Sequence, residues 1–150
     1  MKLSNFFRML FFSLMMLTSS IPAQDLNVYD MIGASRNEVI KKFGKPVHQD
    51  NSIPSMVCLF YKTPEFSLTF VIGTEGVTQL EENINYGSEK EAGEVLNKII
   101  SGSLEKNYAI DTVSAMAYQI TKQGVSADLQ IYSDQISKKF TINLKVKRSY

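Results

Sequence analysis

The side chains that could carry covalent or acid–base chemistry are few in this chain of 150 residues, which has one histidine, His48, and one cysteine, Cys58. A cysteine and a histidine can act as nucleophile and base, but the pair also needs a group that orients the imidazole and a pocket for the oxyanion. No glycine-rich turn between a strand and a helix surrounds either residue. Cys58 lies in an apolar run, where we expect a buried, inert thiol. We therefore predict that the protein is not an enzyme; an envelope hydrolase that uses Cys58 and His48 is the alternative.

Metal and cofactor binding are not expected either. Two potential nitrogen or sulfur ligands fall short of the usual four of a structural zinc site. The carboxylates Glu81 and Glu82 are neighbours in a predicted strand, so they point to opposite faces and cannot share a substrate bond. The turn at 73–76 lacks the lysine and the following helix of a phosphate-binding loop. The sequence predicts no metal and no cofactor.

Aromatic side chains are better candidates for a contact surface. Tyrosine combines a large apolar area with a polar tip and loses few rotamers on binding. Tyr132 alternates onto the polar side of its predicted strand. The run 56–61 is apolar at nearly every position, which suits a strand covered on both sides or one whose outer face meets a partner. We predict that Phe60, Tyr61, Tyr118 and Tyr132 contribute to binding.

The first 23 residues have the composition of an export signal. Lys2 and Arg8 precede a short apolar stretch, and small residues then supply a processing site. The apolar stretch is about half the roughly 20 residues that a membrane-spanning helix needs, and no cysteine at the cut could carry a lipid. We predict a signal peptide at 1–23 and a mature chain at 24–150 that is periplasmic or secreted and has no stable membrane anchor.

Charge argues against a nucleic-acid partner. The whole chain has 16 basic and 15 acidic residues, and removal of Lys2 and Arg8 with the signal leaves a net charge of about −1. A nucleic-acid binder of this size usually carries a marked basic excess. The one basic cluster, near the C-terminus, is interpreted as the solvated face of a strand.

Two segments carry the signals of short helices. In the first, Ser35 and Glu38 form a capping box, and Gly44 with Pro46 ends the helix. The second begins after Ser88, and its apolar residues recur at spacings of three and four. Both helices are amphipathic and therefore need a partner surface.

Strand-like segments follow each helix, and they predict an α+β fold in which two short helices pack on an antiparallel sheet. The expected order is α-βββ-α-βββ in a single domain. The halves 31–85 and 86–150 both open with a glycine, a capping serine and a glutamate. They are either degenerate copies of one unit or similar only because capped helices resemble one another. The expected strands are 56–62, 66–72, 77–85, 113–122, 125–132 and 139–147.

The run 32–46, IGASRNEVIKKFGKP, resembles the opening helix of small exported domains related to BamE (the SmpA/OmlA family) and to β-lactamase inhibitor protein. Those domains begin with a glycine, a hydroxyl residue, a Glu/Gln-Val pair and a terminal Gly-x-Pro. The resemblance implies an antiparallel sheet and a protein that binds rather than catalyses, so no catalytic residue is carried over. The chain departs from the lipoproteins in having no lipidation cysteine, and its second half is closer to the tandem inhibitor arrangement.

These features together predict an exported, non-enzymatic binding module that contacts another envelope or extracellular protein. A small-ligand carrier is a second alternative, and it would need a sizeable apolar pocket between the helices and the sheet. The sequence does not indicate an oligomeric state.

Overall fold

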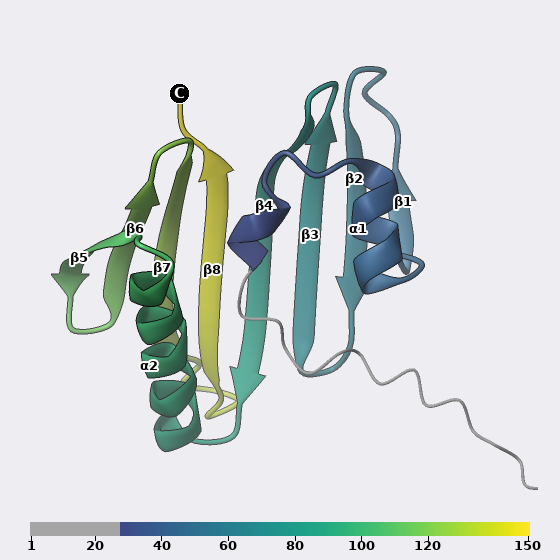
Figure 1. The fold of residues 1–150 in the computed structure, drawn as a ribbon. Helices are drawn as coiled ribbons and strands as arrows, with labels where there is room; N and C mark the ends of the chain where they lie inside the picture. The colour runs from purple at the N-terminus through teal and green to yellow at the C-terminus, as the bar shows by residue number, and fades with distance from the viewer. Residues whose placement is uncertain (1–27) are drawn as a thin grey trace, which may run out of the picture.

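Eight antiparallel strands form one sheet, and two helices pack on the same face of it (Figure 1). The structure is a computed structural model that describes residues 28–150. The predicted signal peptide, 1–23, lies outside the described residues. Within 28–150, none of the helices has both the length and the hydropathy of a membrane span.

The predicted α+β class is confirmed, but each helix is followed by four strands rather than three. The expected order α-βββ-α-βββ is therefore wrong. One expected strand, 113–122, is broken by a turn at 115–116, and the short first strand was not predicted because its three residues are polar. The elements are η1 (Val28–Met31), α1 (Arg36–Phe43), β1 (His48–Asp50), β2 (Val57–Lys62), β3 (Phe66–Gly73), β4 (Gly76–Tyr86), α2 (Glu89–Glu105), β5 (Ala109–Ser114), β6 (Ala117–Lys122), β7 (Val125–Ser133) and β8 (Phe140–Arg148).

The strand order across the sheet is β1-β2-β3-β4-β8-β7-β6-β5. We call α1 with β1 to β4 the first half and α2 with β5 to β8 the second half. The order of one half is mirrored in the other, because the last strand of each half lies at the centre and the first lies at an edge. Asn83 of β4 is directly opposite Asn143 of β8 in the central pair. The junction between the halves is thus an antiparallel strand pair.

The core lies between the helices and one face of the sheet, which we call the covered face. Val39 of α1 and Leu96 of α2 are buried against it. Glu82 also points to this face and is only 3% exposed, whereas Glu81 points to the other, as the alternation predicted. The strands supply the largest buried side chains of the core: Leu59, Leu68, Phe70, Leu80, Ile84, Ile120, Leu129, Ile142 and Leu144.

The predicted helix caps are present. Ser35 Oγ accepts a hydrogen bond from Glu38 N at 3.3 Å, and Glu38 Oε2 accepts one from Ser35 N at 2.7 Å. Gly44 ends α1 with a φ of 79°, a value that glycine adopts without strain. Ser88 Oγ accepts from Glu91 N at 3.3 Å and caps α2, but this is only the serine half of the box, whereas α1 has both halves.

Candidate functional site

The second face of the sheet, which we call the open face, has no helix of the described chain on it (Figure 1). Strand alternation places every other side chain there. β2 and β3 contribute apolar or small side chains, while the central and later strands contribute mainly amides, hydroxyls and charges. The open-face side chains of β2, β3, β4, β8 and β7 are Cys58, Phe60, Lys62, Ser67, Thr69, Val71, Gln79, Glu81, Asn83, Asn85, Thr141, Asn143, Lys145, Lys147, Ser126, Asp128, Gln130 and Tyr132.

The structure does not bring the four predicted binding residues together. Phe60 and Tyr132 point to the open face but are separated by three strands, β3, β4 and β8. Tyr118 lies half-buried in register with the core residue Leu129, on the covered side. Two of the four residues therefore remain on a surface that a large partner could reach.

Tyr61 is placed in the core. It is 8% exposed, and its hydroxyl donates a hydrogen bond to the Gly44 carbonyl at 3.0 Å. Its ring contacts Phe43 and Phe70, with centroids 5.9 and 6.0 Å away. Burial raises the pKa of this tyrosine. Tyr61 thus fixes the end of α1 on the sheet and offers little contact area.

An apolar patch lies at the β1–β2–β3 end of the open face. We call it the β2 patch and define it by His48, Cys58, Phe60 and Val71. The His48 and Phe60 rings are 5.4 Å apart, and Cys58 is directly opposite Val71. Cys58 is half-buried, so the expectation of a fully buried thiol is wrong. The outer side of the apolar run 56–61 therefore faces away from the core.

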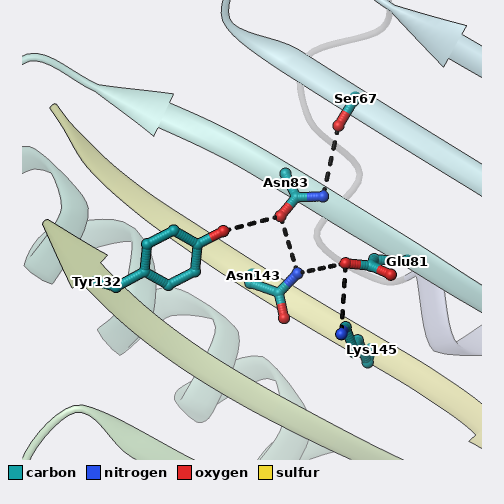
Figure 2. Close-up of polar contacts among 6 residues, drawn as sticks. All are labelled: Ser67, Glu81, Asn83, Tyr132, Asn143 and Lys145. Carbon is teal, nitrogen blue, oxygen red and sulfur yellow. Dashed lines mark hydrogen bonds and ion pairs between the residues drawn. The ribbon is translucent and has the colours of Figure 1, made fainter. Parts of the chain in front are cut away.

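A hydrogen-bonded polar cluster occupies the centre of the open face (Figure 2). Asn143 Nδ2 donates to Glu81 Oε1 at 2.9 Å and to Asn83 Oδ1 at 2.8 Å. Asn83 Nδ2 donates to Ser67 Oγ at 3.4 Å, and Lys145 Nζ lies 3.7 Å from the same Glu81 oxygen. We call these five residues the β8 network. Its two asparagines were not predicted, because only the register of β4 against β8 brings them together.

Tyr132 extends the β8 network to β7. Its hydroxyl donates to Asn83 Oδ1 at 3.3 Å, and the side chain remains 47% exposed. Because β8 lies between β7 and β4, the side chain reaches across β8 to make this bond (Figure 2). Thr141, directly opposite Tyr132 on β8, is buried even though it points to the open face. The ring of Tyr132 is therefore exposed but held in place, because its backbone belongs to β7 and its hydroxyl is bonded to Asn83 of β4.

The geometry offers limited support for the hydrolase alternative. His48 and Cys58 lie on adjacent strands, but His48 is opposite Phe60 and Cys58 is opposite Asp50. No hydrogen bond joins the two side chains in the described structure. The Asp50 carboxylate accepts from Ser52 N at 2.8 Å, which lowers its pKa. Residues 28–150 contain no group of three or more histidine, cysteine, aspartate or glutamate side chains placed to hold a metal ion.

Two shallow hollows lie at the end of the sheet, beside the turn between β3 and β4. They have volumes of about 380 and 340 Å³ and share Ser55, Gly73 and Thr74 in their walls. The carrier alternative required a sizeable apolar pocket between the helices and the sheet. These hollows instead lie where the turn and the β1–β2 loop meet, beside the first residues of α1 in the larger hollow and beside Tyr150 in the smaller.

Comparison with known proteins gives a distant structural likeness only. No protein-family model matches the chain, and no curated protein matches it. Among solved structures, it is similar to an extracellular protein containing a SCP domain from Bacillus anthracis str. Ames, with 14% identity and a TM-score of 0.43 over 80% of this chain and 45% of that one. It is also similar to a cysteine-rich secretory protein from Staphylococcus aureus subsp. aureus Mu50, with 14% identity and a TM-score of 0.41 over 79% and 43%. The chain therefore spans less than half the length of either protein.

The expected resemblance to BamE-like domains and to β-lactamase inhibitor protein is wrong. No family model matches residues 32–46 or any other part of the chain, and the solved structures that it resembles are of another kind. The residues behind the expectation do form a capped helix that stops at Gly44. A capping box followed by glycine and proline stabilises the ends of any short helix. The motif therefore predicts a helix and its ends, and it does not indicate a family.

Proposed function

We propose that this chain is an exported, non-enzymatic binding module that contacts another envelope or extracellular protein through the open face of its sheet. The observation that carries the proposal is the β2 patch, where Cys58, Phe60 and Val71 point away from the core on a face with no covering layer among the described residues. An apolar centre with a polar rim is the usual composition of a protein–protein contact. Export rests on the predicted signal peptide at 1–23.

Phe60 is the proposed anchor of this contact. Its ring is half-buried between the neighbouring strands and stacks near His48, so little side-chain entropy is lost on binding. Thr69 is directly opposite Phe60 and Lys62 follows two residues later on the same side, which supplies polar neighbours. A buried aromatic side chain near the centre of a contact commonly contributes more than the residues around it.

A capture experiment with two matched variants tests the proposal. The exported protein is cross-linked in an extract of the envelope and medium, the captured protein is identified, and the purified pair is titrated. Phe60→Lys should weaken the complex about ten-fold or more, because it places a charge in the apolar centre. Gln119→Lys adds the same charge to exposed strand β6 and should leave binding unchanged. A wild-type chain that forms no saturable complex, or Phe60→Lys binding as tightly as wild type, contradicts the proposal.

We also propose that the two halves are copies of one unit of a helix and four strands. The mirrored strand order supports this, since the last strand of each half lies in the central pair. Homologous sequences provide the test: the profiles of 57–73 and 117–133 should align in register if the unit was duplicated. Profiles that match only at the helix caps contradict duplication.

A further inference from the structure

A second part of the open face has chemistry unlike that of the β2 patch. The β8 network and Tyr132 combine one exposed aromatic ring with several oriented amide, hydroxyl and carboxylate groups (Figure 2). The proposed protein contact does not use these groups. Their arrangement shows which kind of molecule would fit them.

The amide orientations in the β8 network follow from the partners. A carboxylate oxygen only accepts, so the Asn143 atom that bonds Glu81 Oε1 must be the donor Nδ2. The same nitrogen bonds Asn83 Oδ1, which also accepts from the Tyr132 hydroxyl. Asn83 must then turn its own Nδ2 toward Ser67. Each bond thus sets the next, and the two amides are fixed before any ligand arrives.

Asn143 keeps an unused acceptor at the centre of the network. The side chain is 5% exposed, and its Nδ2 makes both of its hydrogen bonds to Glu81 and Asn83. Its Oδ1 accepts no hydrogen bond from the described residues. This oxygen is not among the buried unpartnered atoms of the described residues, so it is open to solvent, and a hydroxyl group of a ligand can take the place of water there. A ligand with a hydroxyl group would supply that donor.

The charges around the network favour a neutral ligand. In one row across the sheet, Glu81, Lys145 and Asp128 are directly opposite one another on neighbouring strands. Charges of both signs therefore alternate, and no field of one sign develops. Nucleic acids and phosphopeptides need clusters of basic side chains, and lipids need a wider apolar surface.

The exposed ring of Tyr132 supplies the apolar part of the contact. A sugar ring carries C–H groups on its faces, which pack on an aromatic side chain, and hydroxyl groups at its rim, which both donate and accept hydrogen bonds. The hydroxyl bond to Asn83 holds the tyrosine over β8, so the ring loses little freedom on binding. An apolar face beside fixed polar groups is the complement of such a ligand.

We propose that Tyr132 and the β8 network form a binding site for a neutral oligosaccharide chain that lies across β4, β8 and β7. The site accepts hydroxyl donors at Asn143 Oδ1 and stacks one sugar unit on Tyr132. Since the open face of the sheet is broad, a chain of several sugar units fits better than a single sugar. The site is separate from the β2 patch and is independent of the proposed protein contact.

Titration calorimetry of the purified full-length exported protein tests the proposal, with chitohexaose and cellohexaose as probes. At least one probe should bind. Tyr132→Ala should weaken that binding about ten-fold or more, whereas Tyr132→Phe, which keeps the ring but loses the bond to Asn83, should weaken it only a few-fold. Asn97→Ala on α2, which packs on the covered face, is the exposed control and should bind as wild type does. Melting curves of all variants check that the fold is kept.

Three results would overturn the proposal. The first is that neither sugar binds the wild-type protein at millimolar concentration. The second is that Tyr132→Ala binds as tightly as wild type, which would move the site elsewhere. The third is that a capped hexaproline peptide binds at Tyr132 and neither sugar binds, which would make the ligand a polypeptide. Phe60→Lys should not change sugar binding, so this test and that of the protein contact can fail separately.

Discussion

The two halves of the sheet share an order of elements but differ in the side chains that they place on the open face. On the covered face both halves use aliphatic side chains, because both must pack against helices. On the open face the first half has the apolar β2 patch, whereas the second half and the junction have amides, hydroxyls and alternating charges. Packing constrains one face of each half, and the other face is free to differ. The open face is therefore where the halves can take different partners.

The halves also differ in how their turns are supported. Gly76 begins β4 at the turn of the first half, and Gly124 lies in the β6–β7 turn of the second half, with φ values of 91° and 83°. The first turn is held against the segment that precedes α1: Gly33 N donates to Val77 O and Val77 N to Ala34 O, both at 2.8 Å. The second turn is held instead by one bond to the end of the chain, from Ser149 N to Gly124 O at 3.1 Å. Similar backbone conformations thus lie in unlike surroundings.

The largest expected effect comes from this pair of glycines. A Cβ at position 76 would lie 2.3 Å from the Gly33 carbonyl oxygen and 2.7 Å from that of Ala34, whereas a Cβ at position 124 would meet nothing within 4 Å. Gly76→Ala should lower the free energy of unfolding by about 3 kcal/mol or more, through overlap and backbone strain. Gly124→Ala has strain alone and should cost about 1 kcal/mol. Urea denaturation measures both, and equal losses would contradict the difference between the turns.

A second prediction concerns Tyr29 of η1, which precedes the first half in the chain and packs against the second. Tyr29 of η1 packs on Tyr108 with centroids 5.2 Å apart, and its hydroxyl accepts from Ser103 Oγ of α2 at 3.4 Å. Burial raises the pKa of Tyr29 from 10.0 to about 12. The folded state therefore holds the neutral phenol while the unfolded chain ionises, so this contribution is complete below pH 10 and is lost as the pH rises toward 12.

Free energies of unfolding measured at about pH 9 and about pH 12 test this contribution of Tyr29 to stability. Wild type should lose about 2–3 kcal/mol through Tyr29 between about pH 9 and pH 12, and Tyr29→Phe should lose correspondingly less. Burial also raises the pKa values of Tyr61 and Tyr108. Both proteins should therefore still lose some stability at alkaline pH through these two tyrosines. An identical pH dependence in wild type and Tyr29→Phe would show that the Tyr29 hydroxyl is not buried against Tyr108 and Ser103.

The fold class could be predicted from the sequence because its signals are local. Alternation marks a strand such as β8, and Ser35 with Glu38 marks a helix start whatever surrounds them. β1 and β5 gave no such signal. β1 has three polar residues, and the β5–β6 turn at 115–116 has neither glycine nor proline. The central pair joins residues about 60 positions apart, which no local pattern specifies.

The candidate sites were predictable to a smaller degree, for the same reason. Alternation correctly placed Tyr132 opposite the core. It gave no answer for Phe60 and Tyr61, because their run is apolar at nearly every position and adjacent strand residues must point to opposite faces. The structure resolves the choice by burying Tyr61 and leaving Phe60 on the open face. Asn83 and Asn143 become a pair only once the register is known.

The smallest expected effect compares the caps that begin the helices of the two halves. Ser35→Ala and Ser88→Ala should each lower the free energy of unfolding by about 1 kcal/mol. Ser35→Ala should cost a few tenths more, because Ser35 and Glu38 bond each other reciprocally at the start of a helix of only 8 residues. The Ser35 backbone amide lowers the pKa of Glu38, so this half of the box is present at neutral pH and is lost as the pH falls through that lowered pKa. Because Ser35→Ala keeps that amide, its cost should not change with pH, whereas the cost of Glu38→Ala, measured by urea denaturation, should shrink in acid. A cost of Glu38→Ala that stays constant with pH would show that the Glu38 carboxylate does not take part.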